Sequence, residues 1–422
     1  MRFWRVLRFA STLFAFALPL ALTGCGGGRM VTVPPASPQS PFVGGNPPPP
    51  MQGRPGPINP PGAGPVKVAL LVPLSGPNAE LGKAMLEAAQ LALFTITSDR
   101  LTLVPRDTAG TAEGAGNAAK SAISEGAQLI LGPLLAAEVE AVKPVARDAK
   151  VNVIAFSTAT QLAGGNVFLM GFLPRQEVMR EVAFARDKGL SRFAVLAPNS
   201  QYGHLMADAL REAAGASGGS VGKVEYLDPR AADPAAAVRR LLSSGARAPP
   251  APGASAAPSP PASVVFDALL LPEGGTRLKQ IANQLKQAGL DPAQVRLLGS
   301  GLWDDPATAG EPALYGGWFA ASPPESRHQF GSRFQATYGH PAPRLASLAF
   351  DAAALAAVLG ESGAEPFSRD AILNPRGFSG VDGLFRFTSE GLVQRGLAVL
   401  ELGPGGNVAI SPAPQNFEDF SY

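Results

Sequence analysis

The chain has 422 residues, of which 46% are hydrophobic and 16% charged, and its net charge is +2. This length predicts two or three domains with a large apolar core, and the balanced charge excludes a cationic body that binds nucleic acid through phosphates. One cysteine excludes a disulfide framework and a cysteine-based zinc site, and three histidines offer little for metal or triad chemistry, so we expect no metal and no cofactor.

The N-terminus has the organisation of a secretory signal. Three arginines within the first eight residues precede an apolar run over 9–22, which is shorter than the roughly 20 residues that span a bilayer. The run ends in Leu22-Thr-Gly-Cys25, which resembles the bacterial lipobox. The resemblance implies a signal peptide over 1–24 and a lipid anchor on Cys25, whereas a plain signal peptide or short membrane helix with a chance cysteine is the alternative. Gly26 after the cysteine favours the outer over the inner membrane.

Two segments have the composition of linkers. Residues 31–66 contain 13 prolines, six glycines and a single charge, Arg54, so they cannot bury enough apolar surface to fold. We expect 25–65 to be a lipidated, proline-rich tether, in which 31–66 reaches up to roughly 110 Å at about 3.1 Å per residue, although a spacer without purpose is the alternative. Residues 246–263 contain Ala, Pro, Ser, Gly and one Arg, which predicts a disordered surface insertion within a domain.

From residue 66 onward, buried strands alternate with amphipathic helices in two series. In the first series, strands are predicted over 66–73, 101–105, 129–131, 151–156 and 168–171. In the second, a helix over 176–188 precedes strands over 193–197, 221–226, 266–271 and 295–298. Strands separated by helices of this length require parallel sheets with right-handed crossovers, so the two series predict two α/β lobes.

The pattern changes after residue 318. Helices are predicted over 326–338 and 345–359, and hairpin-like strands over 383–387 and 397–402. This order is typical of a chain that returns to the first lobe for helices and to the second for edge strands. We therefore expect lobe 1 to comprise 66–172 and about 323–375, and lobe 2 to comprise 173–322 and about 376–402, followed by a C-terminal tail over 403–422.

Five short motifs, in this order and spacing, resemble the type I periplasmic binding proteins of the leucine/isoleucine/valine-binding branch. They are Leu70-Leu-Val-Pro-Leu-Ser-Gly76, Leu131-Gly-Pro133, Ile154-Ala-Phe-Ser157, Tyr202-Gly203 and Phe378-Ser-Gly-Val-Asp-Gly383. The resemblance covers about 66–402 and implies two α/β lobes of parallel sheets flanked by helices, joined by three crossovers around a cleft.

Within that branch the chain looks most like the proteobacterial lipoproteins called penicillin-binding-protein activators. The similar stretches are Gln90-Leu-Ala-Leu-Phe94 and Ala127-Gln-Leu-Ile-Leu-Gly-Pro133. In that group an outer-membrane anchor and a tether bring a binding-protein-like head to a peptidoglycan synthase. The resemblance therefore implies a synthase partner, with an ABC permease as the alternative partner.

Candidate ligand residues follow the strands, because ligands of open α/β sheets bind beyond the carboxyl ends of strands. Ser75 lies in the turn after the first strand, and Ser157 and Thr158 follow the strand that ends at residue 156. The resemblance implies that hydroxyls at the latter turn hold a ligand carboxylate, while ordinary helix capping is the alternative. It also implies that Tyr202 contacts a ligand from lobe 2, unless it merely caps a strand end.

Two acids of lobe 2 are further candidates. Glu273 could pair with a ligand ammonium group or serve only as a solvated turn residue, and Asp304 follows the stretch in which relatives place an acid for the ligand amine. This chain has Ala136 where those relatives place a serine on the ligand carboxylate. The missing serine, and the lack of an acid in the stretch 298–302 before Asp304, argue against an α-amino-acid ligand. Both departures suit a fold that serves a protein partner.

Two patterns that imitate enzyme motifs fail on their context. Gly215-Ala-Ser-Gly-Gly219 matches a nucleophile elbow but follows a helix and precedes a strand, the reverse of the order an elbow requires. Gly114-Ala-Gly-Asn-Ala-Ala119 imitates a dinucleotide loop but lies inside a predicted helix. We therefore expect a non-catalytic protein.

Three functions remain open at the level of sequence. The first is a lipid-anchored, outer-membrane activator of a penicillin-binding protein in peptidoglycan synthesis. The second is the solute receptor of an amino-acid-type ABC permease, which predicts a small polar ligand in the cleft. A purely structural envelope spacer is the third and predicts neither ligand nor partner.

Overall fold

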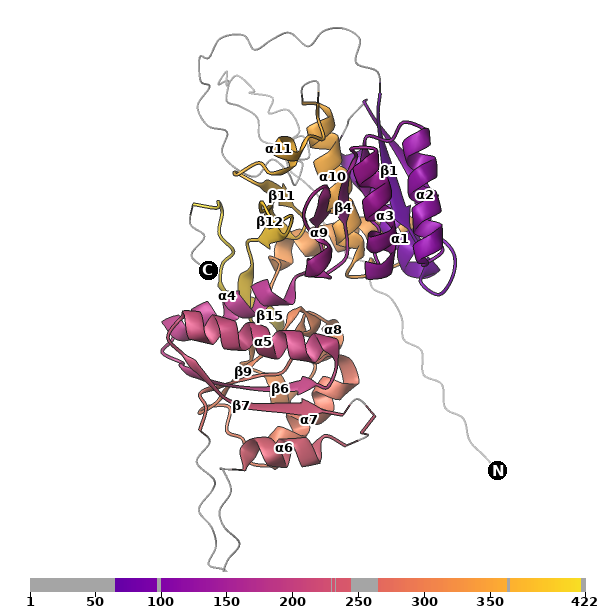
Figure 1. Cartoon of the computed structure of the whole chain (residues 1–422). Helices are drawn as coiled ribbons and strands as arrows, with labels where there is room; N and C mark the ends of the chain where they lie inside the picture. Colours follow the sequence, from indigo (N-terminus) through magenta and orange to yellow (C-terminus); the bar gives the residue numbers. More distant parts are fainter. Residues whose placement is uncertain are drawn as a thin grey trace, which may run out of the picture. The chain divides into compact units, whose positions relative to one another are not determined.

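The computed structural model describes residues 65–96, 100–228, 230–231, 233–243, 265–362 and 365–418. The expected signal peptide, lipidated Cys25, tether and the insertion over 246–263 lie outside these residues. The described part contains two α/β lobes (Figure 1).

Lobe 1 is built on a five-stranded parallel sheet with the strand order β2-β1-β3-β4-β5. The strands are β1 (Val66–Val72), β2 (Leu101–Asp107), β3 (Leu129–Leu131), β4 (Asn152–Ala155) and β5 (Val167–Leu169). Their order follows from the helices that connect them: α1 (Ala79–Thr95), α2 (Ala112–Ser124) and α3 (Ala136–Asp148), with η1 (Thr160–Leu162) before β5. The interior strand β1 is an almost unbroken apolar run, as expected of a parallel strand covered on both faces.

Helices cover both faces of this sheet. On one face α1 packs with α9 (Pro324–Tyr338) and α10 (Ala346–Gly360), and on the other face α2 packs with α3. In α10 fourteen of the fifteen residues are buried, so the helix has almost no polar face. Its alanine-rich sequence permits this, because small side chains let neighbouring elements approach the helix on every side.

Lobe 2 is built on a seven-stranded sheet with the order β15-β14-β10-β9-β8-β6-β7. Its strands are β6 (Arg192–Pro198), β7 (Ser220–Leu227), β8 (Ala268–Leu270), β9 (Arg296–Leu298), β10 (Trp318–Ala321), β14 (Ala398–Gly403) and β15 (Gly406–Ser411). The first five pair in parallel, whereas β14 pairs antiparallel with both β10 and β15. The helices are α4 (Pro174–Asp187) and α5 (Gln201–Ala216) on one face, α6 (Ala235–Leu242) and α7 (Gly275–Gln287) on the other, and the short η2 (Gly301–Trp303), α8 (Pro306–Ala309) and η3 (Pro312–Leu314).

The chain passes between the two lobes three times. The passages lie between β5 and α4, between β10 and α9, and between β13 (Val393–Arg395) and β14. Two arginines connect the first and third passages. Nη2 of Arg395, in β13, donates to the Met170 carbonyl in the first passage, and Nε of Arg180, in α4, donates to the Leu397 carbonyl in the third. The two-lobed, three-crossover fold expected from the sequence is confirmed.

The C-terminal part differs from its prediction. The strands over 383–387 and 397–402 do not form a hairpin, because β12 (Gly383–Phe387) pairs with β11 (Phe378–Gly380) and β13, whereas β14 pairs with β10 and β15. The segment from residue 376, expected to belong to lobe 2, is therefore shared between the two lobes. Its first three strands bury Phe385, Phe387 and Val393 in the lobe 1 core, and only β14 joins lobe 2. The expected tail over 403–422 contains a further strand, β15. The short helix α11 (Arg369–Ile372) precedes β11.

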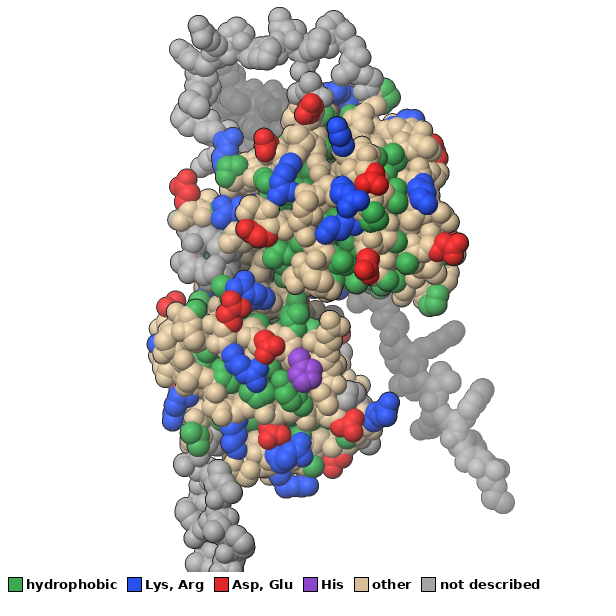
Figure 2. All heavy atoms as spheres, in the orientation of Figure 1, with side chains coloured by type: hydrophobic (Ala, Val, Ile, Leu, Met, Phe, Trp, Pro, Cys, Tyr) green, Lys and Arg blue, Asp and Glu red, His purple; other side chains and the backbone are tan. Residues whose placement is uncertain are grey.

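The described surface offers neither a membrane span nor a metal cluster. No described helix is long and apolar enough to cross a bilayer, and no group of three or more metal-ligating His, Cys, Asp or Glu residues occurs in the described ranges. On the face in Figure 2, cationic and anionic side chains are interspersed, with no large area of one sign. This distribution agrees with the small net charge of the chain.

Candidate functional site

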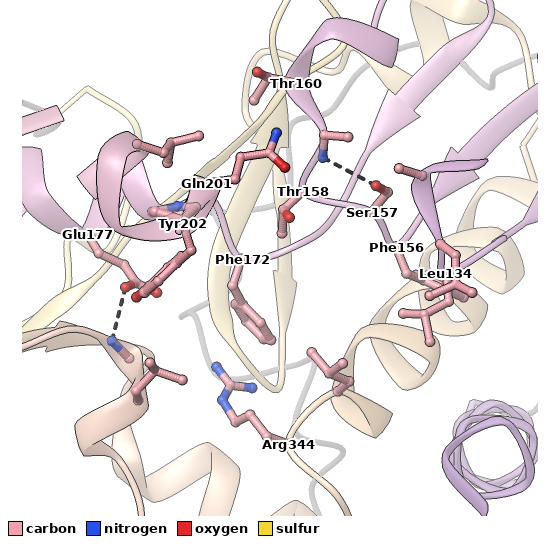
Figure 3. A pocket seen from close by; sticks show the side chains of 18 of the residues that line it. Leu134, Phe156, Ser157, Thr158, Thr160, Phe172, Glu177, Gln201, Tyr202 and Arg344 are labelled. Atoms are coloured by element: carbon pink, nitrogen blue, oxygen red, sulfur yellow. Dashed lines mark hydrogen bonds between the residues drawn. The ribbon is translucent and has the colours of Figure 1, made fainter. Parts of the chain in front are cut away.

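A cavity of about 740 Å³ opens at the strand ends where both sheets lead into helices (Figure 3). This volume is in the range of small-molecule sites, which are typically about 300–1,000 Å³. The residues lining the cavity are Asn78, Leu81, Leu134, Leu135, Ala136, Phe156, Ser157, Thr158, Ala159, Thr160, Gln161, Phe172, Pro174, Glu177, Gln201, Tyr202, Leu205, Gly301, Leu302, Arg344 and Leu345. Most of them are apolar, and a few polar groups converge among them.

The lobe 1 wall combines a hydroxyl turn with a helix N-terminus. Ser157 is buried, and its Oγ accepts a hydrogen bond from the Ala159 N–H at 3.2 Å, so its hydroxyl supports the turn. Thr158 is exposed to the cavity. The N-terminus of α3 also faces the cavity, but the buried Glu138 carboxylate accepts the Leu135 N–H and a hydrogen bond from Thr108. That negative charge already offsets part of the helix dipole, which weakens this end as an anion site.

The lobe 2 wall is formed by the beginnings of α4 and α5 and by the loop after β9. The Tyr202 hydroxyl, in the first turn of α5, donates to Ser300 Oγ at 3.1 Å. Glu177, in the first turn of α4, accepts the Gly301 N–H on Oε2 at 2.9 Å. A Cβ at position 301 would lie 2.8 Å from Glu177 Oε1, so a larger residue there would have to displace the Glu177 carboxylate. Figure 3 shows Glu177 and Tyr202 side by side at this wall.

Burial is the main influence on the pKa values of the two glutamates at this wall. It raises the pKa of Glu177 from 4.5 to about 7, although the Gly301 N–H and the Arg344 charge both lower it. One helical turn later Glu181 is 1% exposed, and neither of its carboxylate oxygens has a hydrogen-bond partner among the described residues. Burial, and after it the neighbouring Glu177, raise the pKa of Glu181 well above its ordinary value.

Arg344, in the connection between α9 and α10, is the one cation among the described residues that line the cavity. Its Nη1 donates to Asp382 Oδ1 at 2.9 Å and to Ser347 Oγ at 3.0 Å, and its Nη2 donates to Ser322 Oγ at 3.3 Å. The guanidinium lies over the ring of Phe172, with Cζ 3.6 Å from the ring centroid. The cavity therefore has an acid at one wall and a held guanidinium at another.

Three of the six predicted ligand residues line the cavity, namely Ser157, Thr158 and Tyr202. The other three are absent from its walls. Ser75 Oγ donates to Asp107 Oδ2 at 2.6 Å, and Asp304 forms an ion pair with Arg327 and accepts from Asn407 Nδ2 at 3.2 Å. The Ser75 hydroxyl and the Asp304 carboxylate are thus engaged within the protein itself.

Glu273 also lies outside the lining residues. Burial raises the pKa of its carboxyl, although the nearby Arg277 lowers it. Its backbone N–H donates to the Leu271 carbonyl in a turn, so the alternative of a turn residue describes its position better than a ligand contact does.

The sequence prediction missed Glu177 and Arg344. Glu177 follows Pro174 in the first turn of α4, directly after the first passage between lobes, and a helix start at that point is a recognisable signal. Arg344 lies in an irregular connection whose sequence carries no motif. Only the tertiary structure brings it beside Phe172.

Comparisons with known proteins agree with this architecture. A model of the family described as "Periplasmic binding protein" matches residues 65–406. A comparison with curated protein sequences found no match.

Solved structures show the same fold. A putative branched-chain amino acid ABC transporter protein from Rhodospirillum rubrum is 19% identical, with a TM-score of 0.70 over 82% of this chain and 100% of that one. A branched-chain amino acid transporter substrate-binding protein from Streptococcus pneumoniae in complex with isoleucine is 19% identical, with a TM-score of 0.58 over 83% and 100%. A solute-binding protein from R. palustris in complex with benzoate is 20% identical, with a TM-score of 0.57 over 83% and 98%.

Proposed function

The chain belongs to the periplasmic binding protein family, and from this premise we propose that it is the solute receptor of an ABC permease of the branched-chain amino-acid type. Members of this family bind solutes in the periplasm and are generally not catalysts. In this proposal one small molecule with an apolar body and polar groups occupies the cavity.

The observation that carries the proposal is the composition of the cavity walls. Apolar side chains such as Leu134, Phe156 and Phe172 surround a small number of polar groups from both lobes, which is the usual organisation of a small-molecule site. The isoleucine and benzoate of the similar structures are molecules of this kind.

The test measures ligand binding by the full-length protein. Isoleucine and benzoate are added separately, and the unfolding midpoint and the heat of binding are recorded. A bound ligand stabilises the native state by about 2.7 kcal/mol at a concentration roughly 100 times its Kd. We expect at least one probe to raise the midpoint in proportion to the logarithm of its concentration.

A matched pair of variants locates the binding site. Leu205→Trp places a bulky ring on a residue that lines the cavity, whereas Val358→Trp does the same at an exposed position of α10 outside the lining. We expect only Leu205→Trp to weaken binding. No binding of either probe, or equal binding by both variants, would contradict a receptor that uses this cavity.

A second candidate is a lipid-anchored activator of a peptidoglycan synthase, held at the outer membrane through Cys25. Ala136 favours it, because the amino-acid-binding relatives place a serine there on the ligand carboxylate. Crosslinking in living cells separates the candidates: a permease subunit among the captured proteins supports the receptor, whereas a penicillin-binding protein supports the activator. Capture of neither, with no ligand bound, would leave the envelope spacer.

A further inference from the structure

Arg344 is held so that part of its guanidinium stays available to the cavity. Asp382, which is fully buried, and the hydroxyls of Ser347 and Ser322 accept three of its N–H groups. A guanidinium has five N–H donors. The two others, Nε–H and one N–H of Nη2, have no hydrogen-bond partner among the described residues, and 32% of the side chain is exposed.

The orientation of this group is set before any ligand arrives. Burial raises the pKa of Asp382, but the charges of Arg344, Arg395 and Arg327 and a hydrogen bond from Ser347 together keep that pKa below its ordinary value. Asp382 is therefore an anion that anchors one edge of the guanidinium, while the ring of Phe172 covers one of its faces. A preorganised side chain loses less conformational entropy when it binds, which strengthens the contact.

The available donors are on Nε and Nη2, the two nitrogens that can together contact both oxygens of a carboxylate side-on. Arginine forms such bidentate contacts with planar anions, and lysine does not, because its ammonium group is a point charge without a fork. Apolar residues, among them Leu345 and Phe156, line the same cavity. Figure 3 shows the Arg344 guanidinium next to Phe172, with Glu177 on one side and Phe156 on the other.

We propose that Arg344 is the specificity-determining residue of the cavity and that it selects ligands in which a carboxylate is attached to an apolar body, by a side-on bidentate contact. This inference rests on the proposed solute-receptor function. It differs from the sequence expectation, in which the hydroxyl turn at Ser157 and Thr158 holds the ligand carboxylate.

The test compares benzoate with its neutral amide, benzamide, on the full-length protein by titration calorimetry. We expect the wild-type protein to bind benzoate at least about tenfold more tightly than benzamide, since a good charge-assisted bidentate contact is worth more than a neutral one. Arg344→Gln should remove the preference for benzoate and leave the benzamide affinity nearly unchanged. Arg344→Lys should keep only part of that preference. Arg369→Gln, at an arginine that is also half-buried but lies outside the cavity lining, serves as the matched control.

A second variant keeps the test valid if Arg344→Gln folds poorly, because that change leaves the buried Asp382 without its ion-pair partner. The double variant Arg344→Gln/Asp382→Asn removes both charges and should restore the unfolding midpoint without restoring the benzoate preference. If Arg344→Gln keeps the preference, the role of Arg344 is wrong while the receptor function stands. If the wild type binds benzamide as tightly as benzoate, the selection for carboxylates is wrong, and if it binds neither these probes nor isoleucine, the receptor function itself is wrong.

Discussion

At the scale of single residues, two neighbouring side chains have different roles, one supporting a turn and the other facing the cavity. Ser157 and Thr158 are adjacent in sequence, and the sequence alone presents them as equivalent hydroxyl donors. The structure separates their roles: Ser157 is buried and bonded to its own turn, whereas Thr158 faces the cavity. Alternation of side chains at a strand end is sufficient to produce this difference.

The two positions should therefore respond differently to loss of the hydroxyl. We expect Ser157→Ala to lower the free energy of unfolding by about 1 kcal/mol, the usual net contribution of one hydrogen bond. Thr158→Val should leave stability almost unchanged and weaken ligand binding several-fold. Urea unfolding and calorimetry on both variants check this, and a Ser157→Ala variant with normal stability and weaker binding would reverse the assignment.

A second residue-scale prediction concerns pH and Glu177. Its pKa is about 7 in the folded chain and ordinarily 4.5, so the native state retains a proton that the unfolded state releases. The contribution of Glu177 is therefore most favourable below pH 4.5, and it is lost as the pH rises to about 7. We expect the wild-type protein to lose stability relative to Glu177→Gln across this window, as measured by urea unfolding at several pH values.

Binding should follow the same titration. The titratable groups near Glu177 are Arg344 across the cavity, Glu181 on the same helix and the Tyr202 hydroxyl of α5. If the ligand carries a carboxylate on Arg344, a protonated Glu177 repels it less, so its affinity should be higher at about pH 6 than at about pH 8. Glu177→Gln should bind equally at both values, and an unchanged pH dependence in that variant would assign the titration to another group.

At the scale of elements, the site depends on how closely a helix start approaches the preceding strand. Gly203 lies in the first turn of α5 against the end of β6, where a Cβ would be 1.9 Å from the Pro198 carbonyl oxygen. Tyr202 is its neighbour, so the position of the cavity wall depends on this close contact. Gly215 lies near the end of the same helix, and a Cβ added there would meet nothing within 4 Å beyond the helix's own backbone.

This difference gives a matched pair within one helix. We expect Gly203→Ala to cost about 1–3 kcal/mol of stability through overpacking and to weaken ligand binding, because α5 must shift. Gly215→Ala should leave binding unchanged and be neutral or stabilising, by up to about 1 kcal/mol, because alanine favours helix more than glycine does. Thermal unfolding and calorimetry on both variants measure the effect; equal destabilisation would show that the close contact at Gly203 is not what distinguishes the two positions.

At the scale of the whole molecule, the length of the predicted tether distinguishes the two candidate functions. About ten extended residues reach at most roughly 35 Å, about a third of the reach expected for the native segment over 31–66. A receptor beside an inner-membrane permease needs little reach, since a short linker already provides a high effective concentration. An outer-membrane activator would have to cross the peptidoglycan.

We therefore expect a chain with this segment shortened to about ten residues to support solute uptake in a deletion strain as well as the full chain does. The unfolding midpoints of the two proteins should be equal, which controls for damage to the folded part. Failure of the shortened chain to rescue, with an unchanged midpoint, would favour the activator.

The local pattern of the sequence determined most of the secondary structure and the two-lobed architecture. Buried runs such as β1 and amphipathic helices such as α5 are specified by their own side-chain periodicity, and parallel pairing follows from the helices between the strands. Ser157 and Thr158 can be identified because they follow a strand, whereas Tyr202 is identified through the resemblance to the binding-protein family.

The features that depend on long-range packing could be seen only in the tertiary structure. The short strands β11, β12 and β13 join the lobe 1 core because α10, with its small side chains, accepts Phe385 and its neighbours there, and nothing in their local sequence specifies that lobe. The same holds for the cavity. Phe172 and Glu177 lie close together at the first passage between the lobes, but Arg344 is far from them in the chain, and only the folded chain places all three around one cavity.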